Sequence, residues 1–423
     1  MSIGLEAKDR DLGQIDVAGF SAGIDRIKSE AYAAIGPADF RHLKRIERYG
    51  LLATLVGYAT AWIFPNPFSA IALSLGLHTR WVLAHHILHR GYDRVPGIPR
   101  RYTSQGFARG WRRYLDWFDW LLPAAWDHEH NVLHHYHTGE DDDPDVAERH
   151  LEFLRRMRIP VALKVVFVAV AACAWKIIYY APNSLAVLED RGRRRRRGVP
   201  MAVLTLGSVL DVRRPAVRRL WLESYAPYAT WHFVVIPLLF LPLGSTAVVA
   251  VLVNKLLAEV ITNAHAFLIV APNHTADDLY RFRFHYGGKG EFYVMSVLGS
   301  ANYHCGPEIV DYFSGWLGYQ IEHHIIPDLP MRQYCLIQPR VKALCLQYEL
   351  PYRQESVFRR FGRLLDICVG KTTMRQLEAF PAAVAAPAED TLPSSGWGGS
   401  GSDILCGATV AGRSDSQGAA GPA

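Results

Sequence analysis

Histidines gather in three short segments of this 423-residue chain. Eight of the 18 histidines lie between residues 85 and 137, where an even spread would place roughly two or three. The three clusters are HHILH at residues 85–89, HEHNVLHHYH at 128–137 and QIEHH at 320–324. Imidazoles in this number suit iron, copper, nickel or zinc rather than magnesium or calcium. The clusters therefore predict a metal site built from three separate parts of the chain.

The spacing within each cluster indicates that the rings can share ions. His85 and His89 stand four residues apart, so on a helix both imidazoles project from one face. His130 and His134 repeat this spacing, and His135 lies about 100° further round the helix. The other candidates are the adjacent pair His323 and His324, Gln320 one turn earlier, and His265 near the end of an apolar segment. One zinc ion takes about four ligands, so this larger set predicts two ions.

Two redox-active ions at the edge of a membrane would suit the oxidation of an unactivated C–H bond. That reaction needs a metal that binds dioxygen, which favours two iron ions over redox-inert zinc. The ligands differ from those of the soluble di-iron bundles, which are carboxylates with a Glu-x-x-His motif. Glu129, Glu322 and the acidic segment 139–145 are expected to orient imidazole N–H groups from outside the ligand set.

The histidine clusters alternate with apolar segments that predict membrane spans. The first pair covers residues 48–64 and 68–88 and is broken by Pro65-Asn66-Pro67, and the second pair covers 231–241 and 245–261. Arginines flank both ends of the first pair and its tip is uncharged, which predicts that both ends are cytoplasmic. We therefore expect an all-α integral membrane protein with about four transmembrane helices in two hairpins and a cytosolic helical cap that holds a di-metal site.

The remaining segments are assigned by composition. The apolar run 160–181 is expected to lie in the interface or to re-enter the membrane, because a further span would put its flanks on opposite faces. The arginine block 191–197 predicts an anchor near anionic headgroups or, alternatively, a docking surface for an acidic electron carrier. Residues 1–47 are expected to form a cytosolic lead-in without a cleaved signal peptide, 48–380 the membrane domain and 381–423 a disordered tail.

In order and spacing, the three clusters resemble the histidine boxes of the membrane fatty acid desaturase and hydroxylase family. The family patterns are H-x(3 or 4)-H, H-x(2 or 3)-HH and (H/Q)-x(2 or 3)-HH, and QIEHHIIP is the most specific match. The resemblance covers roughly residues 45 to 370. The metal ligands that it implies are His85 and His89, then His130, His134 and His135, then His323 and His324, with His265 after the last span. It also implies that Gln320 contacts iron weakly or through water.

The resemblance implies a membrane fatty acid desaturase that uses O₂ and a cytoplasmic di-iron centre to introduce a C=C bond into an acyl-lipid or acyl-CoA. The chain contains no HPGG haem motif, so electrons are expected from a separate donor of the ferredoxin or cytochrome b5 type with its reductase. Two alternatives stay open: a hydroxylase of an alkyl, sterol or carotenoid substrate with the same centre, and a histidine-rich metal transporter. Membrane lipids are expected to surround the protein as partners. No nucleic-acid partner is expected, because the arginine clusters lack interleaved aromatic platforms.

The other histidines are expected to have ordinary roles. His86 and His137 lie beside a box but off its spacing, which favours contacts with solvent or with the outer sides of the ligands. His274, His285 and His304 are isolated in the sequence and are predicted to be satisfied surface or core residues.

Overall fold

The computed structural model describes residues 15–197 and 209–380, with the backbone alone for residues 190–197. Within these residues the chain is mostly helical, which confirms the predicted helical class. Its strands form two short parallel pairs, β1 (Tyr280–Phe282) with β4 (Arg375–Leu377) and β2 (Asn302–Tyr303) with β3 (Gln354–Glu355). The tail predicted for residues 381–423 and the first 14 residues of the predicted lead-in lie outside the described residues.

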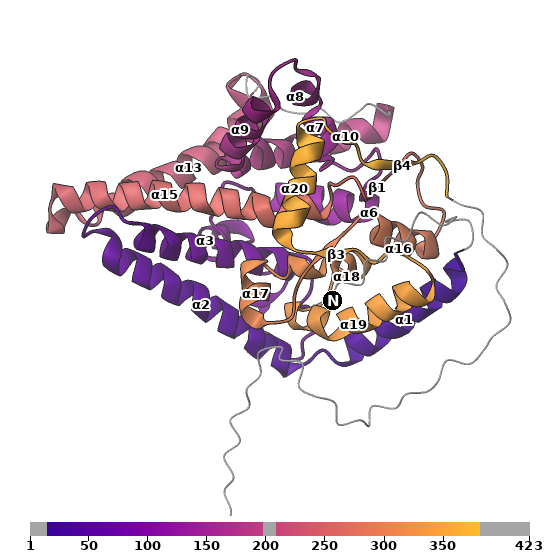
Figure 1. Cartoon of the computed structure of the whole chain (residues 1–423). Helices are drawn as coiled ribbons and strands as arrows, with labels where there is room; N and C mark the ends of the chain where they lie inside the picture. Colours follow the sequence, from indigo (N-terminus) through magenta and orange to yellow (C-terminus); the bar gives the residue numbers. More distant parts are fainter. Residues whose placement is uncertain (1–14, 198–208, 381–423) are drawn as a thin grey trace, which may run out of the picture.

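Three long helices run side by side and form an arm that extends away from the rest of the molecule (Figure 1). They are α2 (Pro37–Ala61), α3 (Pro67–Leu88) and α15 (Ser245–Val270), and α3 packs against both of the others. The break between α2 and α3 falls where the sequence predicts it. Pro67 occupies the first turn of α3, and the Asn66 side chain accepts a hydrogen bond from the Ser69 backbone N–H at 2.8 Å.

Two helices of the described residues, Pro215–Leu243 and Ser245–Asn273, are long and apolar enough to cross a membrane. They correspond to the second predicted hairpin, although its first helix begins well before residue 231. The first predicted hairpin is present as α2 and α3, but α2 begins at Pro37 rather than near residue 48, and its polar first half shortens its apolar length. The count of four spans stays a prediction.

The apolar run predicted at residues 160–181 is bent. Its first part is α9 (Val161–Ala172), and the chain turns by 82° before the helical segment Lys176–Glu189, so that the pair is either one broken span or a re-entrant loop. Two lysines in this run have polar partners: Lys164 donates to the backbone oxygen of Arg155 at 2.8 Å, and Lys176 forms a buried ion pair with Asp119 at 2.7 Å. These contacts explain how an apolar segment accommodates two cations.

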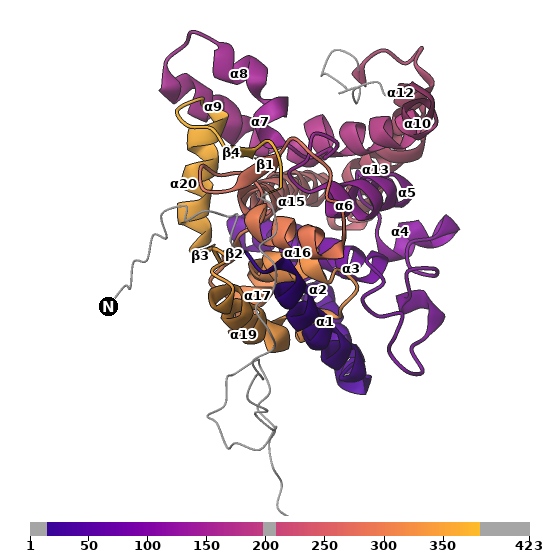
Figure 2. The same ribbon diagram turned by 90° about the vertical axis from the view of Figure 1, so that its right-hand side faces the viewer.

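Most of the other helices form a cap at one end of the arm, whereas the helical stretch Pro215–Leu243 packs along α15. Figure 2 looks onto this cap, with α1 (Val17–Ala33) and α16 (Lys289–Leu298) in front of the arm helices. The predicted lead-in is part of the same hydrophobic core, because Phe20 and Ile24 of α1 are fully buried and α1 packs on α19 (Met331–Gln347). The core therefore joins the start of the chain to its last third.

The other helical segments are short or interrupted. Those up to and including the arginine block are η2 (Arg100–Tyr102), η3 (Gly110–Arg112), α4 (Arg113–Asp116), α5 (Pro123–Trp126), η4 (Asp127–His134), α6 (His135–His137), α7 (Ala147–His150), α8 (Glu152–Arg156), η5 (Lys176–Tyr180) and α10 (Ala181–Arg197). Those after it are α12 (Pro215–Arg219), η6 (Leu220–Tyr225), α13 (Ala226–Thr230), η7 (Trp231–Val235), α14 (Ile236–Leu238), η8 (Leu241–Leu243), η9 (Ala271–Asn273), α17 (Glu308–Phe313), η10 (Leu317–Tyr319), α18 (Gln320–Ile325) and α20 (Val357–Cys368).

Candidate metal centre

Three helical segments bring the histidine clusters together beneath the cap. The end of α3 carries the first cluster, η4 and α6 carry the second, and α18 carries the third. The segment η4 is a π-helix, a wide form that is rare in proteins and frequent at functional sites. The seven box histidines, all of them buried, are His85, His89, His130, His134, His135, His323 and His324.

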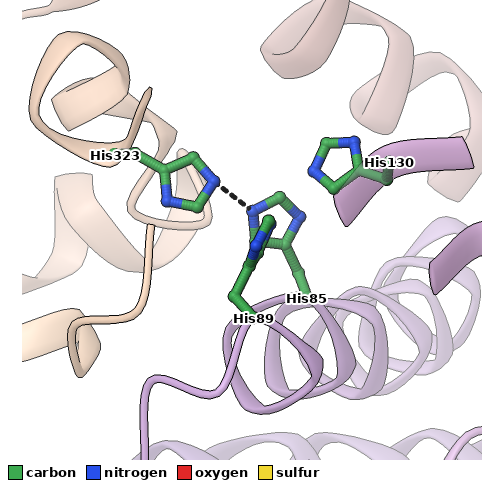
Figure 3. A group of neighbouring side chains, drawn as sticks. All are labelled: His85, His89, His130 and His323. Atoms are coloured by element: carbon green, nitrogen blue, oxygen red, sulfur yellow. Dashed lines mark hydrogen bonds between the residues drawn. The ribbon is translucent and has the colours of Figure 1, made fainter. Parts of the chain in front are cut away.

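One group of four rings converges at a single point. The nitrogens that His85, His89, His130 and His323 offer all lie within 4.8 Å of one another. Figure 3 shows His85 and His89 projecting from one helix, with His323 and His130 reaching towards them from either side. The Nε2 atoms of His85 and His323 are 3.0 Å apart. Four imidazoles at this separation are enough to surround one metal ion.

A second group lies next to the first. The nitrogens of His134, His274 and His324 also lie within 4.8 Å of one another. His135 faces both groups: its ring is stacked on that of His324, with centroids 4.4 Å apart, and its centroid is 4.3 Å from that of His89. The histidines can therefore surround two neighbouring ions.

Many nitrogens in these groups have no hydrogen-bond partner among the described residues. They include His85 Nδ1, His89 Nε2, both nitrogens of His130 and His135, His274 Nδ1 and His324 Nε2. A buried polar atom without a partner loses its hydration and gains nothing in return, so such atoms are rare in folded proteins. A metal ion would give one nitrogen of each of these rings the missing partner, and the donor set therefore fits a metal centre.

Hydrogen bonds on the outer sides of three rings fix which nitrogen faces the centre. His134 Nδ1 lies 2.9 Å from a carboxylate oxygen of Asp143 and donates to it. The Tyr334 hydroxyl donates to the backbone oxygen of Pro327, so at 3.0 Å it accepts from His323 Nδ1. The Thr138 hydroxyl donates to a backbone oxygen and, at 2.8 Å, accepts from His324 Nδ1. Each ring thus keeps a lone pair on Nε2 for a metal.

The electrostatics of the site keep most of its imidazoles neutral. Burial and the neighbouring rings hold the pKa values of His130, His135, His323 and His324 well below the ordinary value for histidine. Burial tends to raise the pKa of Asp143, but the His134 ring and two backbone N–H groups outweigh it, so that this pKa is lowered. Neutral imidazoles supported by an ionised carboxylate are what metal ligation requires.

The expected supporting carboxylates have different roles. Asp143, in the predicted acidic segment 139–145, does orient a histidine. Glu322 contacts no imidazole through its hydrogen bonds and instead accepts from Asn302 at 2.8 Å and from Tyr352 at 2.7 Å. Glu129 is fully buried, and neither of its carboxylate oxygens has a hydrogen-bond partner among the described residues.

His265 and Gln320 lie outside the two groups, whereas an unexpected histidine lies inside. His265 Nε2 is 2.7 Å from the backbone oxygen of Phe313, and its ring rests on His78. Gln320 lies beside the second group and contacts His274, with the two side-chain nitrogens 3.0 Å apart. His274, predicted to be an ordinary residue, belongs to that group. His274 directly follows η9, which continues the long apolar helix α15. This position at the end of an apolar segment is the feature of the sequence that could have marked His274 as a possible metal ligand.

Comparison with known proteins is decisive for the family. The model of the fatty acid desaturase family matches residues 59–356, which includes all three histidine boxes. The chain belongs to the fatty acid desaturase family. A relative from Mycobacterium tuberculosis, described as NADPH-dependent stearoyl-CoA 9-desaturase, is 24% identical over 374 residues, covering 83% of this chain and 79% of its own length. The Arabidopsis thaliana delta(8)-fatty-acid desaturase 2 is 33% identical over 84 residues, 20% of this chain and 18% of the relative.

The desaturase has an apolar cavity of about 490 Å³ that reaches the histidines. His85, His130, His134 and His274 form one part of its wall. Most of the rest is aliphatic or aromatic and comes from the bent segment and α15, including Phe167, Val168, Ala171, Trp175, Phe267 and Val270. This wall is where a hydrocarbon chain would contact the site. No motif in the sequence indicated the residues of this wall, because they come from elements that meet only in the fold.

A second cavity of the desaturase, of about 840 Å³, reaches the histidines from another direction. His89 and His135 lie in its wall, and its other lining residues include several basic and aromatic side chains. The basic residues are Lys28, Arg90, Arg94 and Lys289. The histidine centre therefore has one apolar and one polar approach.

Proposed function

We propose that this desaturase holds two iron ions with its clustered histidines and uses O₂ to introduce a C=C bond into a long fatty acyl chain. The observation that carries the proposal is the pair of adjacent histidine groups, with their unpartnered nitrogens, at the wall of an apolar cavity. The first iron would be held by His85, His89, His130 and His323. The second would be held by His134, His274 and His324, with His135 between the two.

When bound, two irons would supply an oxidant derived from O₂ that can remove hydrogen from an unactivated C–H bond. The residues of the chain prepare the site for this chemistry. Asp143, Thr138 and Tyr334 orient three imidazoles through their outer nitrogens. Because rigid support of this kind limits the movement of a ligand, it favours one geometry of the centre.

The apolar cavity is the proposed binding site for the acyl chain. Phe167 and Val168 of α9 and Phe267 of α15 line it together with His85 and His130. Burial of an alkyl chain here would contribute about 0.8 kcal/mol per CH₂ group. Those contacts would hold the chain along its length and present one C–C bond to the histidine centre.

The proposed topology has four spans in two hairpins, with the metal centre on the cytoplasmic side. The arm formed by α2, α3 and α15, the second long apolar helix Pro215–Leu243 and the basic flanks of the first hairpin support it. The 82° bend after α9 supports a re-entrant segment, since a bent pair of this length can enter and leave on one face. Such a segment would lie beside the apolar cavity that it lines.

Electrons would come from a separate protein of the ferredoxin or cytochrome b5 type, supplied by its reductase. The relative from Mycobacterium tuberculosis is described as NADPH-dependent, which supports such a chain of donors. The polar cavity beside His89 and His135 is lined by four basic and two acidic side chains, and this excess of positive charge would attract an acidic carrier.

The proposal is tested by the fatty acids and the iron of cells that express the wild type or His323→Ala. We expect the wild type to produce an unsaturated fatty acid and to contain about two irons per chain, in keeping with two groups of ligands. The His323→Ala variant should lose the product and at least half of the iron, whereas His304→Ala, which changes an exposed histidine, should keep both. A wild type that binds stoichiometric zinc and no iron, or an active His323→Ala variant, would refute it.

A further inference from the structure

A third group of possible metal ligands lies apart from the two histidine groups of the centre. It consists of His137, Glu140 and His285, whose ligand atoms all lie within 4.8 Å of one another. One carboxylate oxygen of Glu140 is 2.8 Å from His137 Nδ1 and 2.6 Å from His285 Nδ1. The sequence predicts no role of this kind for any of the three residues.

Glu140 is the unusual member of this group. Its side chain is 1% exposed, and no lysine or arginine pairs with it among the described residues. Its second carboxylate oxygen, Oε1, is buried without a hydrogen-bond partner in the same part of the chain. The next residue differs, because Asp141 pairs with Arg281 and Arg283, each at 3.0 Å. A buried carboxylate with only imidazole neighbours costs free energy that a cation would offset.

The backbone holds the two halves of this group in place. Glu140 forms a parallel bridge with Phe282, and the Phe282 N–H donates to the Gly139 carbonyl at 2.9 Å. Gly139 has a φ of +78°, and a Cβ there would lie 2.9 Å from the backbone oxygen of Tyr280. The turn therefore needs glycine in order to approach β1 this closely. His285 follows three residues after Phe282, in the irregular segment between β1 and α16, and reaches Glu140 from there.

We propose that His137, Glu140 and His285 form a binding site for a zinc-class divalent cation that ties the turn after the second histidine box to the segment after β1. Two imidazoles and one carboxylate form a donor set for zinc and similar late first-row metals, and water would complete a tetrahedral shell. Ligand atoms in such a shell stand about 3.4 Å apart. The two nitrogens, now 2.8 and 2.6 Å from the Glu140 oxygen, would each have to lie about 0.6–0.8 Å further from it to admit the ion.

The site lies close to the hydrogen bonds that support the proposed iron centre. Thr138, between His137 and Gly139, accepts the hydrogen bond from His324 Nδ1. A cation at His137 and Glu140 would restrict this turn and therefore the ring of His324. The site does not depend on the identity of the metals at the centre, because it shares no ligand with them.

Zinc binding by the purified, iron-loaded protein tests the proposal. In equilibrium dialysis at fixed free zinc, with iron counted in the same samples, the wild type should bind one zinc that His285→Ala binds at least about tenfold more weakly. The side chain of His285 is 66% exposed, so its removal leaves the fold intact. His304→Ala, another exposed histidine, should bind zinc like the wild type.

Two further measurements keep the proposal falsifiable. Glu140→Gln retains the size of the side chain and should also lose the zinc, and zinc should raise the unfolding temperature of the wild type but not that of His285→Ala. Equal zinc binding by the wild type and His285→Ala would overturn the proposal. A wild type that takes up no zinc at unchanged iron content would overturn it as well.

Discussion

At the scale of single residues, the orientation of the rings is set from outside the centre. Asp143, Thr138 and Tyr334 each bind the outer nitrogen of one imidazole, and each lies in a different environment: a buried acidic turn, a helix end and the cap helix α19. Which nitrogen of each of these three rings faces the centre is consequently set before any ion is present. The supports come from the turn 138–143 and from α19, and a shift of either would strain the hydrogen bonds that it makes to the rings.

His274 and His265 provide a direct test of the ligand set. We expect His274→Ala to lower iron content and weaken metal binding at least about tenfold, because its ring belongs to the second group. His265→Ala should keep its iron, since the Nε2 atom of His265 already contacts the Phe313 carbonyl. Iron per chain in the two purified variants is the measurement. Loss of iron from His265→Ala together with full iron in His274→Ala would show that the assignment is reversed.

Spacing in the sequence predicts which box histidines share a face but not which isolated residues join them. His85 and His89 lie on one helix, so their relation follows from local geometry. His274 reaches His134 and His324 only because the end of α15 packs against the segments of the second and third boxes. The sequence shows that His274 follows a long apolar segment, but it does not show which residues that segment will contact. The sequence therefore also offers no reason to prefer His274 to His265, the histidine nine residues earlier that is the expected ligand after the last span.

At the scale of elements, a buried ion pair fastens α20 to the segment that follows α15. Arg360 is fully buried and contacts both carboxylate oxygens of Asp278, at 2.7 and 2.8 Å. Asp278 lies four residues after His274, so the pair also fixes the approach of that histidine to the centre. Arg360 has a second acidic neighbour in Glu355, at 3.5 Å.

Removal of the Asp278 carboxylate should destabilise the cap. Asp278→Asn leaves the Arg360 cation buried without its main partner, and we expect the free energy of unfolding to fall by about 3–5 kcal/mol. Asp366→Asn, which changes an exposed carboxylate paired with Lys371, should stay within about 0.5 kcal/mol of the wild type. Denaturant unfolding in detergent measures both. Equal stability of Asp278→Asn and the wild type would show that the pair contributes nothing.

The same pair predicts how stability depends on pH. Burial tends to raise the pKa of Asp278, but Arg360 and Arg353 outweigh it and hold this pKa below the ordinary aspartate value. Because the pKa of Asp278 is lower in the folded state, the ion pair contributes its full stability above the pKa of unfolded aspartate, about 3.9. This contribution is lost as the pH falls through the pKa of Asp278 in the folded protein. In the Asp278→Asn variant, the free energy of unfolding should lack this loss at acid pH.

Element boundaries are predicted best where a residue forces them. Pro65-Asn66-Pro67 ends one helix and begins the next, as expected from proline chemistry and the Asn66 cap. The start of the helix Pro215–Leu243 was placed too late because its first half is mixed in polarity and hydropathy alone does not detect it. In the same way, α2 begins at Pro37, before its apolar part. Tertiary packing, rather than local hydropathy, extends both helices.

At the scale of the whole molecule, the proposed topology depends on the bent segment Val161–Glu189. If this segment re-enters, residues on both sides of it share one face of the membrane. Reporters fused after Arg197 and after Phe380 should then both lie in the cytoplasm. If it spans instead and the second hairpin still crosses twice, both reporters change side, and an external reporter after Arg197 would exclude the four-span arrangement.

The proposed metal ligands are drawn from residue 85 to residue 324, so the centre joins parts of the chain that are made at very different times. At a synthesis rate of roughly 5–20 residues per second, more than about ten seconds separate the first box from the third. The early histidines wait without their partners for that interval, and the long-range contacts that complete the groups form late. The proposed irons would then be loaded into a chain that is already largely folded, and their arrival would be the step that ends maturation.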